Sequence, residues 1–342
     1  LNLSAVQTII PDQHPRRSLL TPLPTPGEFL LVLDNSSLEK FTTCPLSARN
    51  YLVLGREAHA RNAALTFGGA IHAGLEVLLK GPLDLSYPVW NKDYTETIPG
   101  ILHARQEEQA DFEARQDQAI VQHFTNNPCP PDEYRTPSTA LEVLKHYRQR
   151  AKFPDYNWTI LSDAKGLLVE RAFELPLGVV DVNDYIDMPW ISLDKYPENH
   201  TLHAPSANEG RVRAHVNRIH LAWSGRMDVI AHAHGMNRVV DHKTTSIAGD
   251  QVIQDFHLSN QTIGYVWAAR QLWPDLDVRG FCGNFIHLKK PTKGGLDLVS
   301  KGPRGGEPPL NFFRAYFEYS PERLDQWVTN VQHVLSDFIH SL

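Results

Sequence analysis

The stretch from Ser224 to Tyr265 places the strongest constraint on how this 342-residue chain can fold. Residues 227 to 231 and 239 to 244 have the period-two pattern of β-strands, and a turn near the sequence HGMN joins them. A helical pattern follows, with Ser259 as the expected N-cap and with Gln261 and Tyr265 on one face. We therefore expect a β-hairpin and a helix at the centre of the fold.

The hairpin carries a charge pattern that suits metal chemistry. Strand alternation places Asp241 and Lys243 on one face, with His242 pointing away. If the two strands pair antiparallel, Asp228 approaches Asp241, and two carboxylates that close repel each other unless a cation lies between them. A divalent metal there would neutralise phosphate charge and lower the pKa of a bound water, while Lys243 would orient that water or stabilise negative charge. The plainer alternatives are a strand-end charge at Asp228 and a surface ion pair between Asp241 and Lys243.

An upstream segment, FGGAIHAGLEVLLKG, has the apolar spacing of a helix. His72 lies beside its apolar stripe, and a histidine at that position, considered alone, is more often a hydrogen-bonded residue at the edge of a core. His72 follows Gly68 in a Gly-x-x-x-His spacing.

Taken in order, Gly-x-x-x-His, Gly-x-x-Asp, Asp-x-Lys and Gln-x-x-x-Tyr resemble the motifs of the PD-(D/E)XK nuclease superfamily and, within it, the RecB-like exonucleases. The resemblance implies an α/β fold with a restriction-endonuclease-like core, in which helices flank a central mixed β-sheet. It implies Mg²⁺ or Mn²⁺ as cofactor and DNA as substrate.

The resemblance also assigns roles to residues. It implies that the metal is bound by His72, Asp228, Asp241 and the backbone carbonyl of His242, with Glu170 as a weaker additional ligand. The catalytic set implied in the same way is Asp228, Asp241, Lys243, Gln261 and Tyr265.

Many relatives bind an iron-sulfur cluster through four cysteines. This chain has three cysteines, Cys44, Cys129 and Cys282, and no group of three near its C-terminal end. We therefore expect no iron-sulfur cluster, because a single thiolate cannot hold one. Cysteines this few and scattered also indicate no disulfide framework, which is typical of a reduced compartment.

The formal net charge of -6 gives no general attraction for polyanions, so DNA contacts would have to come from local basic patches. The candidates are a Gly- and Pro-rich loop and the end of a helix; their basic residues are Lys289, Lys290, Lys293, Arg148 and Lys152. The plain alternatives are a flexible loop and a solvated helix end favoured by the helix dipole.

The expected organisation is a Pro-rich arm at residues 1–34 and one nuclease domain at 35–342. The domain would contain a mostly helical insertion at about 82–165, with a polar helix from Ile101 to Phe124, and a variable insertion at about 178–215. Strands are expected at 278–288 and 311–319, followed by an amphipathic C-terminal helix that packs on the sheet. The arm could dock on a replication or recombination protein.

The sequence shows no apolar run of about 18 residues and no signal-peptide pattern, so we expect a soluble cytoplasmic or otherwise intracellular protein with no membrane partner. The functional hypothesis is a metal-dependent DNA nuclease, acting as an exonuclease on DNA ends in replication, recombination or repair. The alternatives are a non-catalytic DNA-binding or assembly module that retains the fold, and a structure-specific endonuclease.

Overall fold

The computed structural model describes residues 20–48, 62–82, 84–90, 97–152, 158–189, 202–203, 211–247, 250–289, 298 and 310–340. The chain divides into two compact units. Unit 1 comprises residues 1–58, 172–225 and 321–342, and unit 2 comprises residues 59–171 and 226–320. This division differs from the expected single domain at 35–342. Two long strands, β8 (Val169–Pro189) and β10 (Arg211–Ala233), each contribute residues to both units.

Unit 1 builds its sheet on the first half of β10. β2 (Glu28–Leu33) pairs with β10 in parallel, with Phe29 beside Ile219 and Leu31 beside Leu221, and β1 (Leu20–Pro22) pairs antiparallel with β2. β8 and the short β9 (Leu202–His203) also pair with β10. The expected arm at 1–34 is therefore wrong for residues 20–33, because alternate residues of β2 are buried in a sheet; residues 1–19 lie outside the described part of the chain.

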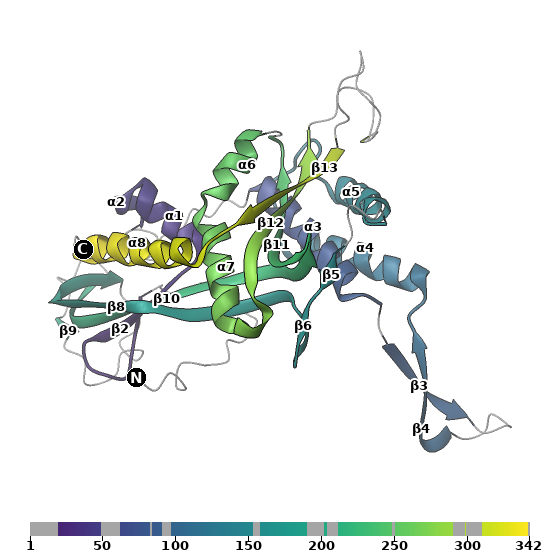
Figure 1. Cartoon of the computed structure of the whole chain (residues 1–342), viewed down its shortest axis with the longest axis horizontal. Helices are drawn as coiled ribbons and strands as arrows, with labels where there is room; N and C mark the ends of the chain where they lie inside the picture. Colours follow the sequence, from purple (N-terminus) through teal and green to yellow (C-terminus); the bar gives the residue numbers. More distant parts are fainter. Residues whose placement is uncertain are drawn as a thin grey trace, which may run out of the picture. The chain divides into compact units, whose positions relative to one another are not determined.

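The helices of unit 1 cover this sheet with apolar side chains. α8 (Pro321–His340) buries its apolar stripe, and the ring of Trp327 meets that of Trp223 on β10 edge to face at 5.3 Å. α1 (Asn35–Thr43) lies beside α8 in Figure 1, with Phe41 and Phe338 centred 4.4 Å apart, and the short α2 (Pro45–Ala48) follows it. The expected packing of the C-terminal helix on a sheet is thus confirmed.

Unit 2 contains a mixed sheet made from the second half of β10 and three further strands. β10 pairs antiparallel with β11 (Met236–Thr245), β11 pairs parallel with β12 (Val278–Leu288), and β12 pairs antiparallel with β13 (Leu310–Glu318). Figure 1 shows β11, β12 and β13 side by side. The hairpin and both later strands lie where the sequence predicts them.

Helices flank both faces of this sheet, as expected for the α/β class. On one face α3 (Ala63–Lys80), α4 (Gln109–Asn126) and α5 (Pro137–Arg150) share an apolar core with Ile286 and Leu288 of β12. On the other face lie α6 (Asp250–His257) and α7 (Asn260–Leu272), with Phe256 of α6 against Phe281 and Phe285 of β12. No helix in the described ranges is long and apolar enough to cross a membrane.

The two expected insertions contain more strand than predicted. Residues 82–165 include α4 and α5 but also the hairpin of β3 (Asp84–Trp90) and β4 (Thr97–Gln106), so the helix expected from Ile101 begins only at Gln109. The short strands β5 (Thr159–Ile160), β6 (Ser162–Asp163) and β7 (Gly166–Leu167) follow, and a 3₁₀ turn, η5 (Pro274–Leu276), precedes β12. The described parts of 178–215 extend β8, form β9 and start β10. The pairing of β8 with β10 joins segments that are far apart in sequence, which a local pattern cannot reveal.

Candidate functional site

Asp228 lies at the centre of the charged cluster in unit 2. Val229 of β10 pairs with Val240 of β11 in the antiparallel register. Asp228 and Asp241 are the next residues on the two strands, on the same side of that pair. Asp228 Oδ2 accepts a 2.7 Å hydrogen bond from the backbone N–H of His242 and lies 3.3 Å from Nδ1 of His72 on α3. The hairpin is antiparallel, and His72 contacts Asp228, whereas their shared role as metal ligands stays a prediction.

Glu170, the second residue of β8, completes a three-residue group with these side chains. One ligand atom from each of His72, Glu170 and Asp228 lies within 4.8 Å of the other two. The backbone of Glu170 has a φ of 53°, in the left-handed region that few residues other than glycine adopt, at a cost of about 1–3 kcal/mol. The bend lies directly after two buried residues, Leu168 and Val169. The pattern in the sequence gave no signal of it.

Asp241 and Lys243 form an ion pair with an Nζ to Oδ2 distance of 3.1 Å, as their shared strand face predicts. Gln261 of α7 donates a 2.9 Å hydrogen bond to Oδ1 of the same carboxylate. Asp241 is only 2% exposed, and its Oδ2 has no aligned hydrogen bond within the described residues despite the nearby ammonium. Gln261 and Lys243 thus hold Asp241, whereas Glu170 joins His72 and Asp228.

The electrostatics of the cluster are strongly perturbed. Burial raises the pKa of Glu170 to about 7, and the neighbouring charge of Asp228 adds to this effect. Burial also raises the pKa of Asp241 to about 6, although Lys243 opposes it. Burial alone would lower the pKa of His72, but the carboxylate of Asp228 raises it to about 9. In Asp228 itself, burial opposes ionisation, yet the charge of His72 and the hydrogen bonds from both histidines keep its pKa well below the usual range.

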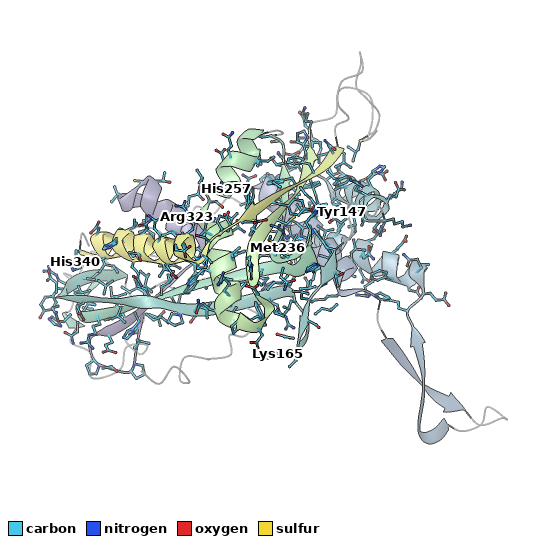
Figure 2. All side chains as sticks on the ribbon, viewed as in Figure 1. Tyr147, Lys165, Met236, His257, Arg323 and His340 are labelled. Carbon is cyan, nitrogen blue, oxygen red and sulfur yellow. The ribbon has the colours of Figure 1, made fainter. Side chains whose placement is uncertain are left out.

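The side chain of His242 takes a part that the sequence did not reveal. It points to the face opposite Lys243, yet its Nδ1 lies 3.3 Å from Asp228 Oδ2. Behind it, Tyr147 of α5, labelled in Figure 2, places its hydroxyl 3.4 Å from His242 Nε2. Because His242 is 1% exposed, burial lowers its pKa and favours the neutral ring. The buried His242 therefore supports the position of Asp228.

Two further residues extend this support toward β13. Asn284 donates a 2.9 Å hydrogen bond to the Tyr147 hydroxyl and accepts one of 3.1 Å from Arg314 Nε. The guanidinium of Arg314 stacks 3.8 Å from the ring centre of Trp158. A polar residue in the middle of an apolar strand, such as Asn284, is the one signal in the sequence that could have pointed to this network.

The remaining predicted residues have different surroundings. Tyr265 is buried on α7, and burial raises its pKa further above the ordinary value, as do the charges of Asp241 and Asp228. The ligand role of the His242 backbone carbonyl stays a prediction. Of the basic candidates, Arg148 is 14% exposed and contacts Asp117 of α4 at 3.2 Å, so it is committed to helix packing. Lys152 and Lys289 are exposed; Lys290 and Lys293 lie outside the described residues.

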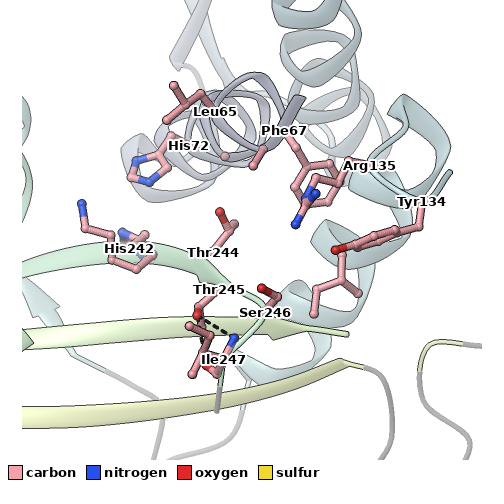
Figure 3. A pocket seen from close by; sticks show the side chains of 15 residues that line it. Leu65, Phe67, His72, Tyr134, Arg135, His242, Thr244, Thr245, Ser246 and Ile247 are labelled. Atoms are coloured by element: carbon pink, nitrogen blue, oxygen red, sulfur yellow. Dashed lines mark hydrogen bonds between the residues drawn. The ribbon is translucent and has the colours of Figure 1, made fainter. Parts of the chain in front are cut away.

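A pocket of about 450 Å³ opens beside the cluster, between the first turns of α3 and the end of β11. Its lining includes His72, His242 and Lys243, and Figure 3 shows His72 and Arg135 bordering the same space. The backbones are close here, because a Cβ on Gly68 would lie 3.1 Å from Thr244 Oγ1. His72 and Lys243 of the charged cluster are therefore open to a ligand from this side.

The three-residue group fits a divalent metal. Two carboxylates and an imidazole are the donors that Mg²⁺ and Mn²⁺ accept in proteins. The raised pKa of Glu170 beside the ionised Asp228 reports a like-charge conflict that a cation would remove. His72 would have to lose its proton to bind it. The residues present are thus suited to hold a metal, with Asp241 next to them.

Comparisons with known proteins add one informative match. A search of curated proteins found none that matches this chain. Among solved structures, a crystal structure of Scheffersomyces stipitis Rai1 in complex with (3'-NADP)+ and calcium ion is 10% identical to this chain, with a TM-score of 0.16. The alignment covers 89% of this chain and 63% of that one, and the likeness is too weak to indicate a shared fold. The sequence profile of the PD-(D/E)XK nuclease superfamily matches residues 35–340, which include the whole cluster. This chain belongs to the PD-(D/E)XK nuclease superfamily.

Proposed function

We propose that this protein is a metal-dependent deoxyribonuclease, similar to the RecB-like enzymes, that hydrolyses phosphodiester bonds at DNA ends. The observation that carries the proposal is the geometry around Asp228. The Asp228 carboxylate lies 3.3 Å from His72 Nδ1 and accepts a 2.7 Å hydrogen bond from the backbone N–H of His242. Ligand atoms of His72, Glu170 and Asp228 all lie within 4.8 Å of one another. A buried carboxylate needs hydrogen bonds, a positive partner or a cation, and these contacts keep Asp228 ionised, as a metal ligand must be.

His72, Glu170 and Asp228 would hold the metal, and Asp241 lies beside them as a further acidic group. A bound Mg²⁺ or Mn²⁺ would supply charge neutralisation at the phosphate and a water of lowered pKa. The remaining work falls to the chain itself. Gln261 fixes the Asp241 carboxylate, which in turn fixes the ammonium of Lys243.

Lys243 is the residue best placed to stabilise negative charge during the reaction. The carboxylates of Asp241 and Asp228 raise its pKa against the effect of burial, so it stays protonated at neutral pH. It also lines the open pocket, where a phosphate group can reach it. A fixed ammonium at a developing negative charge lowers the barrier because no solvent has to reorganise.

The preference for ends and a role in replication, recombination or repair rest on the resemblance to RecB-like exonucleases. The test is to incubate the protein with end-labelled linear DNA and with closed circular DNA, with Mg²⁺, with Mn²⁺ and with EDTA. We expect mononucleotides or short products from linear DNA, intact circles, and no products in EDTA.

Two results would count against parts of this proposal. Cutting of the closed circle would indicate an endonuclease. Tight DNA binding that is insensitive to EDTA, with no cleavage under any metal condition, would instead indicate a binding module that has kept the fold.

A further inference from the structure

We infer that Tyr134 and Arg135 form a subsite that binds one nucleotide of a single DNA strand next to the reacting phosphate. This inference rests on the proposed nuclease function and deepens it. Both residues line the pocket that also contains His72 and Lys243, and Figure 3 shows Tyr134 and Arg135 across that space from His72. Neither residue carries a signal in the sequence motifs.

The charge of the pocket lining points to an anionic ligand. The lining contains Arg135, Lys243 and two histidines, and within the described residues it contains no aspartate or glutamate. It also contains the hydroxyl groups of Thr244, Thr245 and Ser246. The chain as a whole has a net charge of -6, whereas the charged residues of this lining are basic. This local positive charge favours binding of a phosphate group.

The turn before α5 holds Arg135 in a fixed position. Asp132 Oδ1 accepts hydrogen bonds from the backbone N–H groups of Tyr134 at 3.0 Å and Arg135 at 2.9 Å. Asp132 Oδ2 also accepts from Arg135 Nη1 at 3.3 Å. An arginine has five N–H donors, so this contact leaves others for a ligand. Thr136 then caps α5, so the turn is fixed on both sides.

Tyr134 supplies an aromatic surface for a base. Its ring centre lies 4.7 Å from the Arg135 guanidinium, and the ring packs against the apolar core shared by α3, α4 and α5. Tyr134 is only partly buried there and also lines the pocket. Stacking on a protein ring needs a base that is not stacked in a duplex, which a single strand or a frayed end provides. The pocket volume of about 450 Å³ is in the range of small-ligand sites, and this size suits one nucleotide rather than a double helix.

The experiment measures DNA binding by fluorescence anisotropy in EDTA, where no cleavage occurs, with a labelled oligothymidylate and a duplex of equal length. Arg135→Gln should weaken binding of the single strand about tenfold and reduce the salt slope of binding by about 0.7, the value for one phosphate contact. Arg135→Lys keeps the charge and should keep the slope.

The aromatic contribution is tested in the same assay. Tyr134→Leu retains apolar packing against the helices but cannot stack, and should weaken single-strand binding about tenfold with much less effect on the duplex. Tyr134→Phe should bind like the wild type. The matched control is Lys80→Gln, which removes one exposed positive charge from the far end of α3 and should change little.

The outcomes separate this inference from the proposed function. If the wild type cleaves DNA and Arg135→Gln binds the single strand as tightly as Lys80→Gln does, the subsite is overturned while the nuclease stands. Equal losses for single strand and duplex in Tyr134→Leu would also overturn it. If the wild type neither binds nor cleaves DNA, the proposed function fails first.

Discussion

The two units of the molecule differ in what they bury. Among the described residues of unit 1, the buried polar side chain is Ser37, and the rest of its interior is apolar. The described part of unit 2 buries ten polar or charged residues, which are Thr66, Gln116, Thr139, Asp228, Arg238, Asp241, His242, Thr262, Asn284 and His287. Burying a polar group costs free energy unless it is hydrogen-bonded. The contrast indicates that unit 2 carries the chemistry.

The ion pairs of the two units differ in burial in the same way. In unit 1 Arg218 and Asp181 are 2.9 Å apart, but their side chains are 56% and 72% exposed, so the pair contributes little to stability. In unit 2 the Asp241 side chain is 2% exposed and is paired with Lys243. Removing either partner of a partly buried pair such as Asp241 and Lys243 lowers stability, because the other charge is left unpaired.

The largest effect should follow from removing the ammonium of Lys243. Lys243→Ala should lower the rate of DNA cleavage about 1,000-fold, because the charge that stabilises the reacting phosphate is lost. Initial rates on linear DNA measure the effect, and circular dichroism checks the fold. Lys165→Ala, at an exposed turn of unit 2, is the control. Equal rates for both variants would contradict the assigned role.

The corresponding change in unit 1 should affect stability instead. Trp327→Ala removes a ring that is 5% exposed and packs on Trp223, so we expect a loss of about 3–5 kcal/mol in the free energy of unfolding. Urea unfolding followed by circular dichroism measures it, with Val334→Ala on the exposed side of α8 as control. Below the unfolding transition, cleavage per folded molecule should be unchanged. A loss of cleavage with little loss of stability would break the contrast between the units.

A smaller gain in stability is expected from Glu170→Gln without metal. The folded-state pKa of Glu170, about 7, lies above its ordinary value, so the ionised group costs stability progressively as pH rises from about 4.5 to 7, and fully above that. At pH 8 in EDTA the variant should be more stable than the wild type by about 2 kcal/mol, whereas at pH 4.5 the two should be nearly equal.

Thermal unfolding at both pH values measures this difference. The control is Glu142→Gln on α5, outside the charged cluster, where the carboxylate contacts Lys145 at 3.1 Å; this variant should not be more stable than the wild type. A Glu170→Gln variant that is less stable than the wild type at pH 8 would mean that Glu170 is not in conflict with Asp228.

The smallest effect concerns the pH dependence of metal binding. His72 has a pKa of about 9 in the metal-free protein and must be neutral to bind a metal, so the association constant for Mn²⁺ should rise about tenfold per pH unit between 7 and 9. Below pH 7 the proton on Glu170 should steepen the dependence. Calorimetric titration measures it, and His72→Gln should bind more weakly with a flatter profile. The same slope in the variant would exclude His72 as the source.

Local patterns in the sequence were sufficient to predict the central hairpin, the face shared by Asp241 and Lys243, and the helix that carries Gln261. These features depend on a period of two or 3.6 residues within one segment. The left-handed bend at Glu170 and the contact from His242 to Asp228 were beyond reach, because a local pattern does not show how β8 and β11 each pair with β10. The parallel pairing of β2 with β10, in which Glu28 lies beside Arg218, was missed for the same reason.

The most direct test of the account is where a metal binds. A crystal grown with Mn²⁺ should show an anomalous difference peak within about 2.5 Å of ligand atoms of His72, Glu170 and Asp228, and Asp228→Asn should abolish both the peak and DNA cleavage. A peak elsewhere, or full cleavage by Asp228→Asn, would contradict the assignment of the site.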